Sequence, residues 1–323
     1  MIKTRITEIL DIKYPIVQGG MQWLSNGELA AVVSEAGGLG IISAASFPDP
    51  EELREQIRKA KKLTSNPFGV NVSMLPQTSY GDLTEGYFQV VLEEGVPVVE
   101  TAGRNPEEYV PRLKEAGIKL IHKVPAARYA HKAEKIGADV VTVVGFECGG
   151  HPGMDDVTTL VVTPKTASTV NIPVLAGGGI ADARGFVAAL SLGAEGVVMG
   201  TRFAATTECL AHALYKEWIV GAQETDTMIV ERSIRNPLRA MRNAAAEKVL
   251  EMEKQGATLE ELMTVISGKH GKKALEEGNL NDGVLAAGQV AGLINEIKPV
   301  REVIEEIIEE AREIIGRLNG IGF

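Results

Sequence analysis

Residues 172–201 read IPVLAGGGIADARGFVAALSLGAEGVVMGT, two short apolar runs separated by a segment with apolar residues at helical spacing. The first run leads into Gly177–Gly179 and the second into Gly200, and Gly193 stands where a glycine commonly ends a helix. Runs that are apolar throughout are typical of parallel strands covered on both faces. This stretch therefore predicts a strand, a helix and a second strand parallel to the first.

The same unit recurs toward the N-terminus. Six further apolar, largely β-branched runs precede these two, and helical patterns such as 50–63, 105–116 and 127–137 separate them. Eight alternations of similar length predict a TIM-type (β/α)8 barrel. The alternative is an open doubly wound sheet, which more often carries a G-x-G-x-x-G turn, and this sequence contains none. The predicted strands are 15–18, 39–43, 68–73, 96–100, 119–124, 140–145, 172–176 and 196–199.

The pattern changes after residue 207. Residues 208–277 show helical spacing without strand-like runs, with helices expected at 210–220, 237–253 and 259–267. We expect residues 208–284 to form a helical insertion or cap beside the barrel mouth. Residues 1–207 would form the barrel, completed by residues 285–323, whose last helix (299–318) is expected to dock on it. The acidic residues of that helix are expected to form a solvated face: Glu305, Glu306, Glu309, Glu310 and Glu313.

Composition narrows the class of protein. A chain of 323 residues that is 45% hydrophobic can bury a large core. Its 33 Lys and Arg against 43 Asp and Glu give a formal charge of −10, which argues against nucleic acid as a partner. No apolar run approaches the roughly 20 residues that span a bilayer, and no signal region precedes Pro15. Cys148 and Cys209 match neither a disulfide framework nor zinc spacing, so we expect a cytoplasmic protein without a metal site.

The chemistry is expected at the carboxyl ends of the strands, where TIM barrels carry their active sites. Glycines after strands seven and eight let backbone N–H groups approach a phosphate, and the helix that follows adds a favourable dipole. Gly177–Gly179 together with Gly200-Thr201 therefore predict a site for a phosphorylated ligand. Lys123 ends strand five at the mouth, where a cation suits a ring that gains negative charge. His151, in a glycine-flanked loop after strand six, can donate a hydrogen bond or a proton near neutral pH.

Other polar residues near the mouth have simpler interpretations. Cys148 could form a thiolate with His151 as its partner, although a small space-filling residue is the preferred interpretation. Asp155 and Asp156 are expected to lie in a solvated loop. The basic segment 267–273 could meet a dinucleotide phosphate, with an exposed turn as the default.

Several of these segments resemble one family of enzymes. QGGMQW (18–23), FGVNVSML (68–75), GFECGGHPG (145–153), AGGGI (176–180), GTRF (200–203) and AGQVAGLI (287–294) resemble the nitronate monooxygenase (2-nitropropane dioxygenase-like) superfamily. These are FMN-dependent barrels that include enoyl-ACP reductases and NADH:quinone reductases. GFECGGHPGMDD (145–156), ETAG (100–103), SIRN (233–236) and RAMRN (239–243) are most similar to the quinone reductase branch.

The resemblance implies roles for particular residues. His151 would face the substrate side of the flavin, and Pro76 and Gln77 would help seat the nicotinamide. Lys123 would stabilise the reduced ring. The residues that would hold FMN are Gly20, Met21 and Gln22 along the ring, Ser73, Lys123 and Gly149 in contact with it, and Gly177, Gly178, Gly200 and Thr201 at the phosphate.

The implied reaction has two steps. NADH or NADPH delivers hydride to flavin N5 and leaves, and an electron acceptor then takes its place. Quinone reduction is the primary prediction. Nitronate oxidation with dioxygen and enoyl thioester reduction remain open, as does a phosphate-binding barrel enzyme without flavin. The physiological acceptor, the choice between NADH and NADPH, the productive use of dioxygen and a homodimeric state also remain open.

Overall fold

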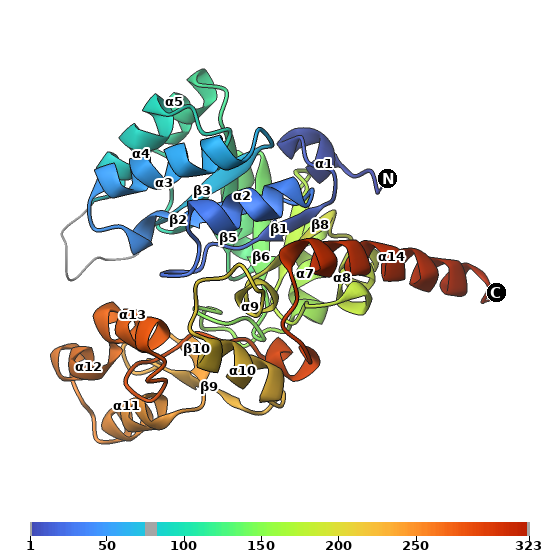
Figure 1. Ribbon diagram of the computed structural model, residues 1–323. Helices are drawn as coiled ribbons and strands as arrows, with labels where there is room; N and C mark the ends of the chain where they lie inside the picture. The colour runs from blue at the N-terminus through green and yellow to red at the C-terminus, as the bar shows by residue number, and fades with distance from the viewer. Residues whose placement is uncertain (1, 75–82, 322–323) are drawn as a thin grey trace.

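Eight parallel strands form a nearly closed barrel in the structure, a computed structural model that describes residues 2–74 and 83–321 (Figure 1). The strands pair in the order β1-β8-β7-β6-β5-β4-β3-β2, and a parallel bridge between Val17 and Leu39 links β1 to β2. This arrangement confirms the predicted TIM-type barrel. The strands are β1 (Ile16–Gln18), β2 (Gly40–Ser43), β3 (Phe68–Met74), β4 (Val98–Gly103), β5 (Lys119–Val124), β6 (Val140–Val144), β7 (Val174–Gly177) and β8 (Gly196–Met199).

Helices follow the strands around the outside of the barrel. The helix over residues 50–63 has the predicted bounds. Its ends are defined locally, since Asp49 caps it, Pro50 is its first residue and Lys61 and Lys62 lie in its last turn. The helix predicted at 105–116 is shorter, since residues 105–109 precede its first turn. The outer elements are α2 (Gly27–Glu35), η1 (Ala44–Ser46), α3 (Pro50–Leu63), α4 (Thr84–Glu93), α5 (Val110–Glu115), α6 (Ala127–Lys135), α7 (Thr159–Ala167), α8 (Ala183–Ser191) and α9 (Thr201–Ala204).

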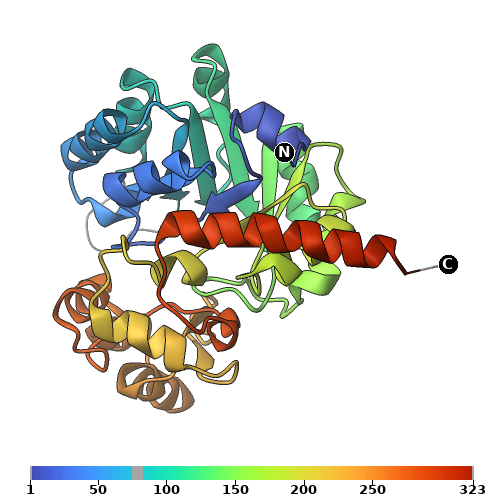
Figure 2. The same ribbon diagram turned by 45° about the vertical axis from the view of Figure 1, so that its right-hand side comes forward.

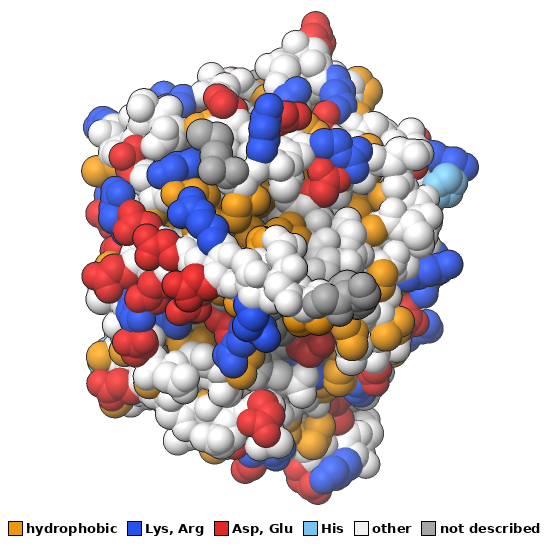
Figure 3. Space-filling view, turned by 90° about the vertical axis from the view of Figure 1, so that its right-hand side faces the viewer, with side chains coloured by type: hydrophobic (Ala, Val, Ile, Leu, Met, Phe, Trp, Pro, Cys, Tyr) orange, Lys and Arg blue, Asp and Glu red, His pale blue; other side chains and the backbone are white. Residues whose placement is uncertain are grey.

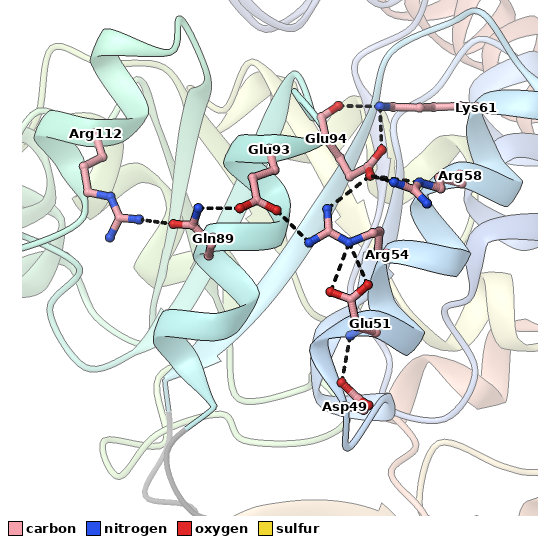
Figure 4. Close-up of polar contacts among 9 residues, drawn as sticks. All are labelled: Asp49, Glu51, Arg54, Arg58, Lys61, Gln89, Glu93, Glu94 and Arg112. Atoms are coloured by element: carbon pink, nitrogen blue, oxygen red, sulfur yellow. Dashed lines mark hydrogen bonds and ion pairs between the residues drawn. The ribbon is translucent and has the colours of Figure 1, made fainter.

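A network of charged side chains joins α3 to α4 on the outer surface (Figure 4). Arg54 of α3 contacts three carboxylates, those of Glu51, Glu93 and Glu94. Arg58 and Lys61 also pair with Glu94, whose side chain is only 8% exposed. Several charges that share partners in this way stabilise more than an isolated surface pair does.

Two further helices, at the two ends of the chain, pack on the barrel. An N-terminal helix that the sequence did not predict, α1 (Arg5–Leu10), packs Ile6 and Leu10 against inward-facing strand residues such as Val98 and Val140. The final helix, α14 (Val300–Asn319), packs on α8 and α2 through Ile304, Ile307 and Ile308, which confirms the predicted docking. Figure 2 shows α14 running across the barrel. Figure 3 views the molecule from the right-hand side of Figure 1 and shows Asp and Glu side chains gathered at the left of that face.

Residues 213–277, which follow β8 and α9, lie below the barrel in Figure 1. The prediction that residues 208–277 contain no strand is wrong, because β9 (Thr227–Val230) and β10 (Leu238–Met241) form an antiparallel hairpin. The sequence of β10, LRAM, favours a helix locally, and pairing with β9 and with Gly150 overrides that preference. The basic segment 267–273 is largely the first half of a helix and not a turn. The remaining elements are α10 (Ala213–Gly221), α11 (Ala244–Lys254), α12 (Leu259–Ile266), α13 (Gly268–Glu277) and η2 (Gln289–Leu293).

Residues 228–284 contribute a small apolar core of their own, built around Val230, Val249 and Leu262. A second cluster mixes barrel residues such as Ala204 with Tyr215 of α10 and Ala291 of η2. The domain boundaries at 207 and 285 stay a prediction. No helix among the described residues has both the length and the apolar character needed to cross a membrane.

Candidate functional site

The ends of β7 and β8 form an anion-binding geometry from backbone groups. Gly178 and Gly179 have positive φ angles of 92° and 72°, and Gly200 is the N-cap of α9 without a side-chain cap. In the described part of the chain, no loop or turn hydrogen bond uses the N–H groups of Gly178, Gly179, Gly200 or Thr201 as donors. Four free donors on neighbouring strand ends fit the phosphate of a ligand such as FMN. The expected contribution of α8 is weaker, because the Asp182 side chain already caps that helix at Gly185 N.

A clamp from the strand-six loop holds the glycine turn in place. The carboxylate of Glu147 accepts hydrogen bonds from the backbone N–H of Thr159, at 3.1 and 3.0 Å, and from its hydroxyl. The Thr159 hydroxyl also lies 2.8 Å from the carbonyl oxygen of Gly178. These contacts orient the carbonyl of Gly178. The N–H of Gly179 belongs to the same peptide plane, so its direction is set as well. Glu147 is therefore a positioning residue, although it was not among the site residues predicted from the sequence.

The segment before η2 completes this corner. Gly288 N donates to the hydroxyl oxygen of Thr201 at 3.0 Å, and Gln289 N donates to the carbonyl of Glu147. A Cβ added to Gly149 would lie 2.8 Å from backbone atoms of Ala287 and Gly288. Gly149 thus meets neighbouring backbone directly, which gives it a structural role beside the predicted flavin contact. The sequence signal for Gly288 was present in the motif AGQVAGLI, although it was not counted among the site residues.

On the side of the mouth formed by β1, β3, β4 and β5, a series of side-chain contacts links Gly20 to Lys123. A Cβ at Gly20 would clash with the Asn71 side chain at 2.7 Å, and Asn71 Nδ2 donates to Glu100 Oε2 at 2.7 Å. Lys123 Nζ lies 3.0 Å from Glu100 Oε1 and 3.1 Å from Oε2. Glu100 is fully buried and Lys123 is one-fifth exposed. The predicted cation is present, but an adjacent carboxylate that sequence reasoning missed compensates its charge.

The remaining predicted cofactor residues surround these two walls. Met21 Sδ is 3.7 Å from the position of a Cβ on Gly200, so the ends of β1 and β8 are adjacent. Gln22 is exposed, and its amide donates to the carbonyl of Ala45 at 3.2 Å. Ser73 lies half-buried near the end of β3, beside Ala102 of β4. Pro76 and Gln77 lie outside the described residues.

Trp23, the last residue of QGGMQW, has a strained backbone. Its φ angle of 70° is unusual for an aromatic residue, and its N–H donates to the hydroxyl of Ser46. Gly268 of α13 packs close to the indole ring, and Lys272 Nζ lies 5.3 Å from the ring centroid. These contacts join the β1 loop to the insertion.

His151 lies between the barrel and the insertion. Its Nδ1 is 3.2 Å from the carbonyl oxygen of Pro237, just before β10. Surrounding protein atoms lower the pKa of His151, and backbone carbonyls of Pro237 and Asn236 partly oppose this shift. The ring keeps an exposed surface, so the pKa is set by crowding around the ring and not by complete burial. In the neutral form Nδ1–H donates to Pro237, which leaves Nε2 as the atom that can face a ligand.

The β9–β10 hairpin is attached to the strand-six loop at several points. Gly150 and Arg239 exchange two backbone hydrogen bonds, of 2.7 and 3.0 Å. The guanidinium of Arg239 lies over the Phe146 ring at 4.4 Å, and Arg232 pairs with Asp156 at 2.8 Å. The loop that carries His151 is thereby held by the insertion.

Two groups near the mouth are poorly suited to acid–base roles near neutral pH. Burial raises the pKa of the Cys148 thiol to about 12, which favours the space-filling interpretation over the thiolate. Burial lowers the pKa of His122 to about 4, and its Nδ1 is 2.8 Å from the hydroxyl of Thr101. Asp155 and Asp156 pair with Arg128 and Arg232, and the described residues contain no cluster suited to a metal ion.

Two surface hollows lie away from this site. One of about 710 Å³ lies between α10 and the turn at 278–282, and one of about 520 Å³ lies between α2 and the start of α14. Neither is lined by any of the predicted site residues, and neither collects convergent catalytic groups. The carboxyl ends of the strands therefore remain the candidate active site.

Known proteins match the chain over almost its whole length. The family described as nitronate monooxygenase matches residues 3–310. The solved structure of FabK from Thermotoga maritima is 43% identical, has a TM-score of 0.93 and covers 99% of each chain. A Mycobacterium tuberculosis protein named (3aS,4S,5R,7aS)-5-hydroxy-7a-methyl-1-oxo-octahydro-1H-indene-4-carboxyl-CoA dehydrogenase is 33% identical, with 96% of each chain covered. A probable nitronate monooxygenase from Staphylococcus saprophyticus is 32% identical and covers 98% of this chain and 99% of its own.

Proposed function

This chain belongs to the nitronate monooxygenase family and is an FMN-dependent oxidoreductase, and we propose that it takes hydride from NADH or NADPH and reduces a quinone. The observation that carries this proposal is the convergence of three segments on one wall of the mouth. The strand-six loop, the turn at 233–236 and β10 resemble the quinone reductase branch in sequence. The strand-six loop contacts β10 through Gly150–Arg239, and it contacts the two residues that flank the turn through Arg232–Asp156 and His151–Pro237.

The residues of the barrel would bind and orient FMN. Free N–H groups at Gly178, Gly179, Gly200 and Thr201 would hold its phosphate, and Glu147 and Gly288 would keep those groups in place. Gly20 and Met21 would lie along the ring, with Lys123 at its electron-accepting side. When bound, FMN would supply the redox chemistry by accepting hydride from the nucleotide and passing electrons to the acceptor.

His151 would act on the acceptor. With Nδ1 held by Pro237, Nε2 faces the ligand side, where it can bind an acceptor oxygen and, when protonated, deliver a proton to it. The hairpin fixes the ring orientation, because the Pro237 carbonyl belongs to the segment that leads into β10.

A second candidate function is the reduction of an enoyl thioester. Two of the similar proteins favour it: FabK, at 43% identity, and the dehydrogenase whose name contains a carboxyl-CoA thioester. In this reaction His151 would contact the thioester carbonyl or the carbon that receives a proton. The same residues would hold FMN in either reaction.

A comparison of acceptors tests the proposal. Purified enzyme reduced with NADH under anaerobic conditions is mixed separately with a benzoquinone, crotonyl-CoA and an alkyl nitronate, and the return of oxidised flavin absorbance is followed. The proposal expects the quinone to reoxidise the enzyme fastest. Rapid reoxidation by crotonyl-CoA alone would replace it with the thioester reaction. Turnover of nitronate with dioxygen, without any nucleotide, would replace both.

A further inference from the structure

Glu100 is a fully buried carboxylate inside a barrel whose other interior positions are largely apolar. It lies in the middle of β4, directly opposite Asn71 of β3, and its carboxylate reaches Lys123 near the end of β5. Moving a carboxylate out of water costs several kcal/mol unless a partner compensates it. Its partners are Lys123 Nζ and Asn71 Nδ2, at 3.0 and 2.7 Å.

This ion pair is not needed to hold the barrel together. Well-packed apolar side chains usually stabilise a core as much as a buried ion pair does, or more. Inward-facing neighbours on the same sheet, such as Val98, Ile121 and Val140, show that the barrel interior packs well with aliphatic residues. Lys123 lies near the mouth end of β5, and Glu100 lies on the mouth side of Val98, which belongs to the layer that α1 packs against. The placement indicates a role in the site.

The charges at this wall balance. Lys123 contributes one positive charge and Glu100 one negative charge, while Asn71 is neutral. The nearby Cys148 thiol adds no charge, because burial raises its pKa to about 12. Lys123 alone would present a net cation to a bound ring, whereas the pair presents a dipole. Glu100 Oε1 contacts Lys123 Nζ but accepts no hydrogen bond from the described residues, so this oxygen is held mainly by charge attraction.

We infer that Glu100 is a positioning residue of the flavin site: it holds Lys123 and offsets its charge, and so lowers the tendency of bound FMN to accept negative charge. The inference rests on the proposed function, since Lys123 must lie beside the flavin. Asn71 keeps the second carboxylate oxygen occupied and connects the pair to Gly20 in the β1 loop. The flavin environment is therefore set by side chains of β3, β4 and β5 acting as one unit.

Sulfite binding measures this charge without turnover. Sulfite adds to oxidised flavin to give a negatively charged product, which bleaches the visible absorbance, so a net positive charge nearby tightens its binding. The experiment titrates sulfite into four FMN-loaded proteins: the wild type, Glu100→Gln, Lys123→Met and the double variant. Glu94→Gln serves as the control, because Glu94 is also buried and ion-paired but lies in the α3–α4 network.

The charge account predicts an order of affinities. Glu100→Gln should lower the sulfite Kd about tenfold or more, and Lys123→Met should raise it by a similar factor, since one unit charge changes at short range. The double variant, neutral again, should return to within about threefold of the wild type. Glu94→Gln should leave the Kd unchanged.

Two results would overturn the inference. One is an unchanged Kd in Glu100→Gln; the other is a double variant that keeps the full shift of Glu100→Gln. If Glu100→Gln does not retain FMN, the double variant and Lys123→Met decide the question: equal weakening of sulfite binding in both contradicts charge balance. Failure of the proposed function looks different, because a wild-type protein that binds no FMN gives no flavin spectrum at all.

Discussion

His151 Nδ1 lies 3.2 Å from the carbonyl oxygen of Pro237, 86 residues further along the chain. This contact joins the strand-six loop of the barrel to the segment that begins β10 in the insertion. Because a carbonyl only accepts hydrogen bonds, Nδ1 carries the proton in the neutral ring, and Nε2 is free to accept or, after protonation, to donate. The insertion therefore determines which nitrogen of His151 meets a substrate.

The pH dependence of acceptor reduction follows from this arrangement. Crowding lowers the pKa of His151 from its usual 6.5, so the protonated form that can supply a proton accumulates only as the pH falls through this lowered pKa. We expect the rate of quinone reduction by the reduced enzyme to rise as the pH falls and to level off only below the lowered pKa of His151, that is, at a pH below the usual value for a histidine. Stopped-flow measurement of flavin reoxidation gives this profile. His151→Gln should lower the rate about 10²-fold or more and flatten the profile, and a profile that remains sloped in this variant would remove His151 from proton transfer.

Gly178 is expected to be needed for FMN binding. Its φ angle is 92°, and an added Cβ would lie 2.9 Å from the carbonyl oxygen of Gly145 and 3.1 Å from Cys148 N. Gly178→Ala should raise the Kd for FMN about tenfold or more, because the turn must shift at the phosphate. Gly117→Ala is the matched control, with φ of 72° and nothing within 4 Å of its Cβ. Both variants should lose about 1–2 kcal/mol of stability from backbone strain, but Gly117→Ala should keep its affinity for FMN; equal FMN affinities in the two variants would contradict this use of Gly178.

Cys148 is expected to be chemically inert. Burial raises the pKa of its thiol to about 12, so the thiolate is scarce at neutral pH. Cys148→Ser should retain turnover within about threefold, and iodoacetamide should not inactivate the native enzyme at pH 8. A loss of about 100-fold or more in Cys148→Ser, with FMN still bound, would restore the nucleophilic interpretation.

Arg54 is expected to contribute to thermal stability but not to activity. It bridges Glu51, Glu93 and Glu94 between α3 and α4, with a side chain only 15% exposed (Figure 4). Arg54→Met should lower the Tm by about 1–2 °C, the shift expected for about 1 kcal/mol in a chain of 323 residues. Arg58→Met, at a side chain that is 61% exposed and pairs with Glu94 alone, should change the Tm by less. Equal shifts in the two variants would show that the shared network adds nothing.

The fold could be predicted from the sequence because its signals are local. Each of the eight strands is a compact apolar run, and glycines such as Gly137 and Gly193, both with φ above 90°, mark the ends of helices. The hairpin at 227–241 was missed although β9, TMIV, is rich in β-branched residues, because β10 gives no local strand signal and its pairing is a tertiary effect. The sequence of β10 contains no β-branched residue, and its strand conformation depends on β9 and on Gly150.

The candidate site could be predicted only in part. Glycine turns and strand-end residues such as Lys123 can be located from the sequence, because each directly follows or ends an apolar strand run. Glu100 and Glu147 do not, since their importance comes from partners on other strands and loops, Lys123 and Thr159. Pairings of this kind depend on the register of the barrel, which spacing along one strand does not specify.

An anaerobic absorption spectrum of the purified protein, recorded before and after NADH and then after a quinone, tests the central claim most directly. The account predicts a flavin spectrum that NADH bleaches and a quinone restores, with one equivalent of NADH consumed per flavin. A protein that binds no FMN, or whose bound FMN stays oxidised in the presence of both NADH and NADPH, would contradict it.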